Sequence, residues 1–144
     1  MSEKWLRIAL IVVDVFAALS AIVGAIGLVV GFMNIPLSVL SGTPFADFTI
    51  PALLLGIVVG GSALVAGLIA LIGPRRAEPL ASGIAGCIMV GWMTIEIAMI
   101  GMGSWLQPTY LVVGLVMIAL AVALELRQRA ALHQPALSGL HRMA

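Results

Sequence analysis

Residues 6–32 read LRIALIVVDVFAALSAIVGAIGLVVGF, and Arg7 and Asp14 are the only charged residues in this stretch. A helix needs about 20 predominantly apolar residues to cross a hydrocarbon core of about 30 Å, because each residue adds about 1.5 Å. The stretch meets that length and exceeds the apolar region of a secretory signal, which has about 7 to 15 residues. We therefore predict an uncleaved first membrane-spanning helix.

Three more apolar stretches of similar length follow, at residues 50–72, 80–103 and 109–126. The chain is 62% hydrophobic and 9% charged, whereas about a quarter of the residues in a soluble domain are charged. We predict an all-α integral membrane protein in which residues 1–126 form one bundle of four spanning helices with antiparallel neighbours. Residues 127–144 are expected to form a basic tail that begins as a helix.

The basic residues predict the orientation of this bundle. All seven lie at the N-terminus, in the loop between the second and third spans, or after the fourth span. Four crossings place these three segments on one side, and loops rich in Lys and Arg remain cytoplasmic. Both termini are therefore expected in the cytoplasm, and we expect the location to be a bacterial plasma (inner) membrane. Two or three cations per segment are too few for a nucleic-acid surface.

Small residues recur at helical spacing within the spans and predict close packing of the helix backbones. The clearest stripes are Asp14, Ala18, Ala21 and Ala25 in the first span; Gly56, Gly60, Ala63, Gly67 and Ala70 in the second; Gly83 and Gly86 in the third; and Tyr110, Gly114, Met117 and Ala121 in the fourth. The same stripes could also serve contacts with a second copy or a larger membrane complex.

Two carboxylates, Asp14 and Glu96, fall in the interior of the predicted spans, away from the span ends. Asp14 follows Trp5 by nine residues and Glu96 precedes Trp105 by nine residues, so each is expected about 13 Å from its own interface. If both tryptophans mark interfaces, the acids lie within about 3 to 4 Å of the same depth. Acids inside a membrane usually face the bundle interior and bind something. The pair is therefore predicted to bind a proton or cation, or else to stabilise the bundle by hydrogen bonds.

The third span also carries Met89, Trp92, Met93 and Met99 near Glu96, and we expect these side chains to line an apolar cavity. The spacing of Met89 and Met93 resembles the Met-x-x-x-Met motif of the Ctr copper transporters. Flexible thioethers more often fill gaps between helices, and we predict no metal site and no cofactor. The pair His133 and His141 is too small a set for zinc.

Three functions remain open. The first is a small proton- or cation-coupled carrier or channel-like protein that uses the carboxylate pair, acting as a homo-oligomer. The second is an accessory subunit of a larger membrane complex, and the third is a protein that binds lipid or another hydrophobic ligand. Catalytic motifs are absent from the sequence, so enzyme activity is not expected, except for proton transfer to a lipid-soluble substrate.

Overall fold

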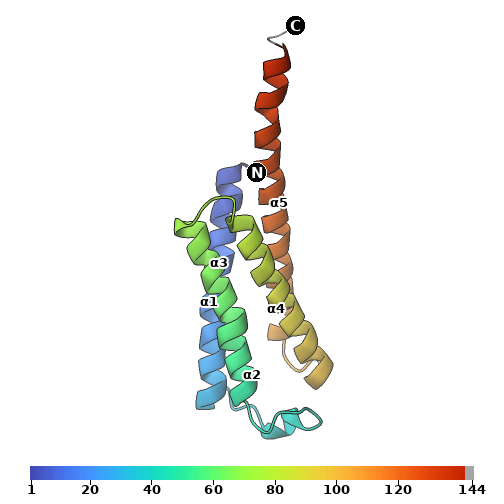
Figure 1. Ribbon diagram of the computed structural model, residues 1–144. Helices are drawn as coiled ribbons and strands as arrows, with labels where there is room; N and C mark the ends of the chain where they lie inside the picture. Colours follow the sequence, from blue (N-terminus) through green and yellow to red (C-terminus); the bar gives the residue numbers. More distant parts are fainter. Residues whose placement is uncertain (142–144) are drawn as a thin grey trace.

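The computed structural model describes the backbone of residues 1–141 and the side chains of residues 1–132. All regular structure in that part is helical (Figure 1). Four helices are long and apolar enough to cross a membrane. They are α1 (Glu3–Val30); a second helix composed of α2 (Thr49–Leu53), the π-helical η2 (Leu54–Gly60) and α3 (Gly61–Ile72); α4 (Glu78–Ile100); and α5 (Leu106–His141).

Glycines set the ends of two of these helices. Gly31 and Gly101 both have φ of 73°, a positive value that glycine adopts without steric cost. Gly31 has the left-handed helical conformation that commonly ends a helix, whereas the ψ of Gly101 is extended. As a result α1 stops at Val30 and α4 at Ile100. Both ends come slightly earlier than the apolar pattern predicts, because that pattern continues past each glycine.

The last helix continues from the fourth span into the tail, which was expected to begin as a helix. α5 begins at Leu106 and continues without interruption to His141, beyond the tail boundary at residue 126. The residues that follow the boundary are mostly Ala, Leu, Arg and Gln, which favour helix. The end of the predicted tail, residues 142–144, lies outside the described residues.

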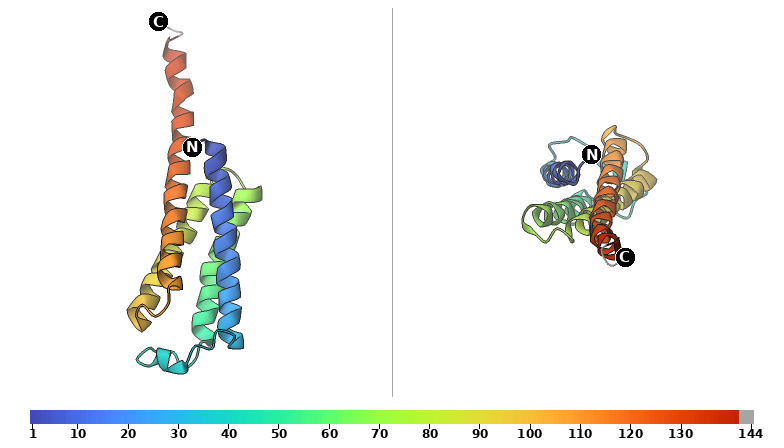
Figure 2. Two further views of the ribbon diagram at one scale, coloured as in Figure 1. Left: turned by 180° about the vertical axis from the view of Figure 1, so that it is seen from behind. Right: turned by 90° about the horizontal axis from the view of Figure 1, so that it is seen from above.

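The helices form two antiparallel hairpins. In the first hairpin α1 packs against η2 and α3, and in the second α4 packs against α5. The two hairpins meet near the N-terminus, where α3 contacts α4 and α1 contacts α5. At the opposite end α4 diverges from α2 (Figures 1 and 2). We call the end near the N-terminus, which carries Arg7 and Arg75, the charged end. The opposite end, which carries residues 31–48, is the loop end.

The small-residue stripes lie in the helix interfaces, as predicted. A Cβ added to Gly56 would lie 2.9 Å from the Cβ of Ala25, across the contact of η2 with α1. Between α4 and α5 a Cβ on Gly86 would lie 2.9 Å from the carbonyl oxygen of Gly114. The two backbones therefore touch directly in the second hairpin. The buried members of the stripes are Asp14, Ala18, Ala21, Ala25, Gly60, Ala63, Gly67, Ala70, Gly86, Gly114, Met117 and Ala121.

The connection between α1 and α2 lies across the loop end. It contains one short 3₁₀ helix, η1 (Leu37–Leu40), whose Leu40 is buried. The backbone N–H of Thr49 donates a 2.9 Å hydrogen bond to Oδ1 of Asp47, which lowers the pKa of Asp47. The carboxylate thus satisfies one of the free N–H groups at the start of α2. This connection brings apolar side chains over the space between the hairpins.

Candidate functional site

Asp14 lies in the contact between α1 and α4, where its side chain is completely buried. The hydroxyl Oγ of Ser82, which is also completely buried, donates a 2.6 Å hydrogen bond to Oδ2 of Asp14. The second carboxyl oxygen, Oδ1, has no hydrogen-bond partner. The hydrogen bond therefore connects the two hairpins deep inside the bundle.

An ion pair lies one helical turn from Ser82, toward the charged end. Nε of Arg7 is 2.9 Å from Oε2 of Glu78, and the Glu78 side chain is only 1% exposed. A terminal nitrogen of Arg7 donates a 2.7 Å hydrogen bond to the carbonyl oxygen of Ala70 in α3. Because Glu78 and Ser82 share one face of α4, the ion pair and the Ser82–Asp14 bond together close the charged end between α1, α3 and α4.

Glu96 lies near the loop end. Nε2 of Gln107, the second residue of α5, donates a 3.2 Å hydrogen bond to Oε1 of Glu96. The amide oxygen of Gln107 in turn accepts a 3.0 Å hydrogen bond from the backbone N–H of Gly103. Gln107 is 3% exposed, so a buried amide holds the carboxylate against the turn that joins α4 to α5.

The structure does not bring Asp14 and Glu96 together, so the expected carboxylate pair does not form. Asp14 contacts Ser82, and fourteen residues of α4 separate Ser82 from Glu96. At about 1.5 Å per residue the two acids are offset by about 21 Å along the bundle. The sequence predicted equal depths because Asp14 is nine residues from Trp5 and Glu96 is nine residues from Trp105, and both tryptophans were assumed to lie at an interface. Glu96, however, lies only one turn before the end of α4.

Two cavities open between the hairpins toward the loop end, and Glu96 lines both. The larger has a volume of about 350 Å³ and the smaller about 110 Å³. Met89 and Met93 line the larger cavity, whereas Trp92 and Met99 line the smaller one. Leu28, Ile35 and Leu55 contribute to the walls of both. The four residues named with Glu96 from the sequence thus lie beside the same apolar cleft.

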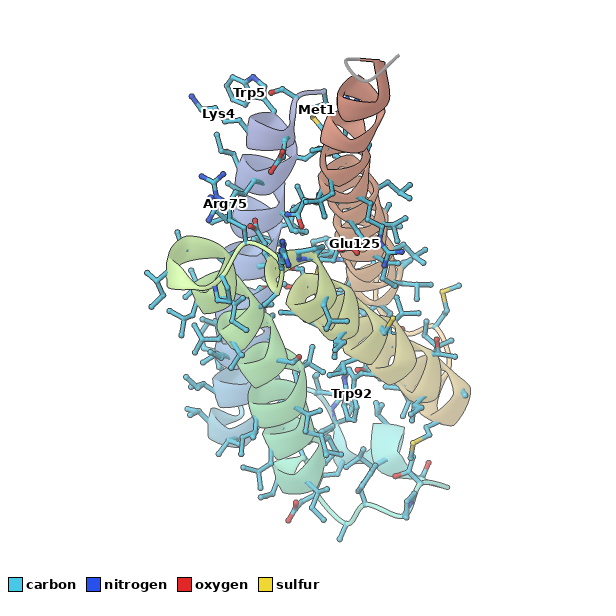
Figure 3. The ribbon with its side chains drawn as sticks, turned by 45° about the horizontal axis from the view of Figure 1, so that its top comes forward. Met1, Lys4, Trp5, Arg75, Trp92 and Glu125 are labelled. Carbon is cyan, nitrogen blue, oxygen red and sulfur yellow. The ribbon has the colours of Figure 1, made fainter. Side chains whose placement is uncertain are left out.

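Trp92 supplies a second polar group in this cleft. It precedes Glu96 by one turn on the same face of α4, and Figure 3 shows it in the space between α4 and the second helix. Its indole Nε1 is buried and lies beside the Glu96 carboxylate, but it forms no well-aligned hydrogen bond with any partner. Most buried polar groups in proteins form well-aligned hydrogen bonds, so this arrangement is unusual. The cleft therefore offers a carboxylate and a neighbouring indole N–H in apolar surroundings.

Sequence reasoning missed three residues of these sites. Glu78 lies two residues before the predicted third span and was not considered, although Pro79 after it favours the first turn of a helix. Ser82 follows Glu78 by four residues, a spacing that predicts a shared helix face. Gln107 lies in a turn, and only the fold brings it to Glu96. Arg7 was interpreted as a topology charge, yet it is also the partner of a buried acid.

Comparisons with protein-family models, with curated proteins and with solved structures give no match. Among the described side chains, no group of three His, Cys, Asp or Glu residues is placed to hold a metal ion. His133 and His141 lie outside the described side chains. The two polar sites and the cleft are therefore the features of this chain that indicate a function.

Proposed function

We propose that the chain is an integral membrane protein that binds a lipid-soluble molecule in the cleft between its two hairpins. The observation that carries this proposal is that the buried indole N–H of Trp92 and the Glu96 carboxylate lie side by side in the cleft without a well-aligned hydrogen bond between them. A hydroxyl group can accept from an indole N–H and donate to a carboxylate at the same time, and a protonated amine can donate to the carboxylate alone. The ligand class is therefore an amphipathic molecule with a hydroxyl or amine at one end and an apolar body.

The walls of the cleft support an apolar ligand body. Ligand sites in proteins are concave and mostly apolar, with few polar groups that fix the orientation of the ligand. Here the polar groups are Glu96, Gln107 and Trp92 together with the hydroxyl side chains of Ser20, Thr43, Ser104 and Tyr110, while the other walls are mostly aliphatic side chains and methionines. The connection over the loop end adds Phe45 and Phe48 to the smaller cavity.

The orientation proposed for this protein places both termini and the loop between α3 and α4 in the cytoplasm, following the distribution of Lys and Arg. The charged end then faces the cytoplasm and the cleft opens within the outer half of a bacterial plasma membrane. Membrane lipids are the proposed surroundings of the bundle. Self-association and docking to a larger membrane complex both stay predictions from the sequence.

A carrier function is the second candidate, and the asymmetry of the two ends favours it. At the charged end the hairpins are linked through Ser82 and Asp14, whereas at the loop end they enclose cavities. A carrier with alternating access needs one closed and one open end in each state. In such a carrier only Glu96 would bind the cargo.

The flux of a long-chain amine into proteoliposomes should fall to the protein-free rate in Glu96→Gln. Equal flux in Glu96→Gln and in the unaltered protein would remove this candidate.

Ligand binding is tested by quenching the fluorescence of Trp92. Replacing Trp5 and Trp105 with Phe leaves Trp92 as the single tryptophan, and both replaced residues are exposed, at 59% and 75%. A long-chain alkylamine brominated along its chain is expected to quench Trp92 at saturable low concentrations. In Glu96→Gln the affinity should fall about tenfold, because a charge-assisted hydrogen bond in a desolvated site contributes about 1.5 to 3 kcal/mol.

Two controls make the result specific. A brominated alkane of equal length lacks the polar group, and its quenching should be weaker and insensitive to Glu96→Gln. Glu125→Gln changes a carboxylate that lies near the charged end in an ion pair with Arg129, so it should leave the affinity unchanged. Equal quenching by the amine and the alkane would show partition into detergent or lipid, and the proposed site would be rejected.

A further inference from the structure

We propose that the groove between α1 and α3 at the charged end binds the headgroup of an anionic phospholipid. This groove has a volume of about 590 Å³ and lies away from the cleft. Its rim carries three cations, Lys4, Arg7 and Arg75. The inference rests on the membrane insertion proposed above but not on the ligand of the cleft.

The charges of the rim leave an excess of positive charge. Among the described side chains neither Lys4 nor Arg75 forms an ion pair, whereas Arg7 is paired with Glu78. Glu3 is the one acid in the wall of the groove. Two free cations against one carboxylate attract an anion, and phosphate oxygens are strong acceptors for ammonium and guanidinium groups. Figure 3 shows Lys4 and Arg75 on the same side of the bundle.

The wall below the rim favours a lipid over a free phosphate ion. Ile8 and Ile11 follow Lys4 by one and two turns on the same face of α1, and Leu71 of α3 lies opposite them in the groove. Ile8 is 39% and Leu71 54% exposed, so apolar surface continues from the cations toward the middle of the bundle. Trp5, 59% exposed beside Lys4, is typical of the headgroup level. Basic pockets between spanning helices on the cytoplasmic side commonly bind such headgroups.

The test is native mass spectrometry of delipidated protein in detergent, titrated with phosphatidylglycerol or with phosphatidylcholine. The unaltered protein should bind phosphatidylglycerol more tightly than phosphatidylcholine. Lys4→Gln/Arg75→Gln should weaken its binding about tenfold or more, at about 1 kcal/mol per cation. Arg76→Gln/Arg127→Gln removes the same charge from residues outside this groove and should bind as the unaltered protein does. Lys4→Arg/Arg75→Lys keeps both charges and should also retain binding.

Three outcomes would overturn the proposal. Equal binding of the two lipids would show that the groove does not recognise charge. Equal loss in the Arg76→Gln/Arg127→Gln control would show that net charge, not the groove, attracts the lipid. Displacement of phosphatidylglycerol by inorganic phosphate at equal concentration would assign the groove to a free ion. Failure of membrane insertion itself would be seen separately, as failure of the unaltered protein to float with vesicles.

Discussion

Replacing Arg7 with Ala is expected to destabilise the folded protein by about 3 kcal/mol, because Glu78 then remains buried without its cation. Removing one partner of a buried ion pair costs about 3 to 5 kcal/mol. The lower end applies here because the Arg7 side chain is 27% exposed while that of Glu78 is 1% exposed. The measurement is denaturant-induced unfolding in mixed micelles, followed by circular dichroism.

A matched control and a double variant separate the ion pair from a general loss of charge. Arg76 forms no ion pair among the described side chains, so Arg76→Ala should change the free energy of unfolding by less than about 0.5 kcal/mol. Arg7→Met/Glu78→Leu replaces the pair with apolar side chains and should recover most of the lost stability. If Arg7→Ala and Arg76→Ala behaved alike, the pair would not hold the charged end together.

The second large effect is expected from Gly86→Ala in α4. The added Cβ would lie 2.9 Å from the carbonyl oxygen of Gly114 and 2.9 Å from Cγ1 of Ile118. A backbone oxygen cannot move away without shifting α5, so the second hairpin must separate. Overpacking of this kind costs about 1 to 3 kcal/mol, which the same unfolding measurement detects.

Gly91 provides the control on the same helix. A Cβ at Gly91 meets no atom within 4 Å, and alanine favours helix over glycine by about 1 kcal/mol. Gly91→Ala should therefore be neutral or stabilising. If Gly86→Ala were as stable as Gly91→Ala, the close contact of α4 with α5 would not exist in solution.

Much of the fold could be predicted from the sequence because long apolar stretches and their boundary residues have local causes. Pro51 and Pro79 lie in the first turns of their helices, where proline is favoured. The stripe from Gly56 to Ala70 faces α1, because small residues permit backbone contact. The helical start of the tail was expected, but the continuation of α5 through Pro135 and Gly139 was not, since proline and glycine disfavour helix.

The site was less predictable because its contacts join distant residues. Asp14 and Ser82 are 68 residues apart, and no pattern along the chain indicates their hydrogen bond. The depth of Glu96 was inferred from Trp105, yet the structure places this carboxylate against Gln107 at the turn between α4 and α5. The position of an acid along a span therefore did not reveal its partner. Residues one or two turns from it, such as Trp92, share its face and were identified correctly as neighbours along the helix.

The central claim is that the cleft beside Trp92 and Glu96 holds an amphipathic ligand, and an experimental structure of the protein with a bound long-chain alkylamine tests it most directly. We expect elongated density between α2 and α4, with the amine nitrogen within about 3.2 Å of a Glu96 carboxylate oxygen and the alkyl chain against the Trp92 ring. A structure in which protein side chains fill that space and the Trp92 N–H donates to a backbone carbonyl would contradict the claim.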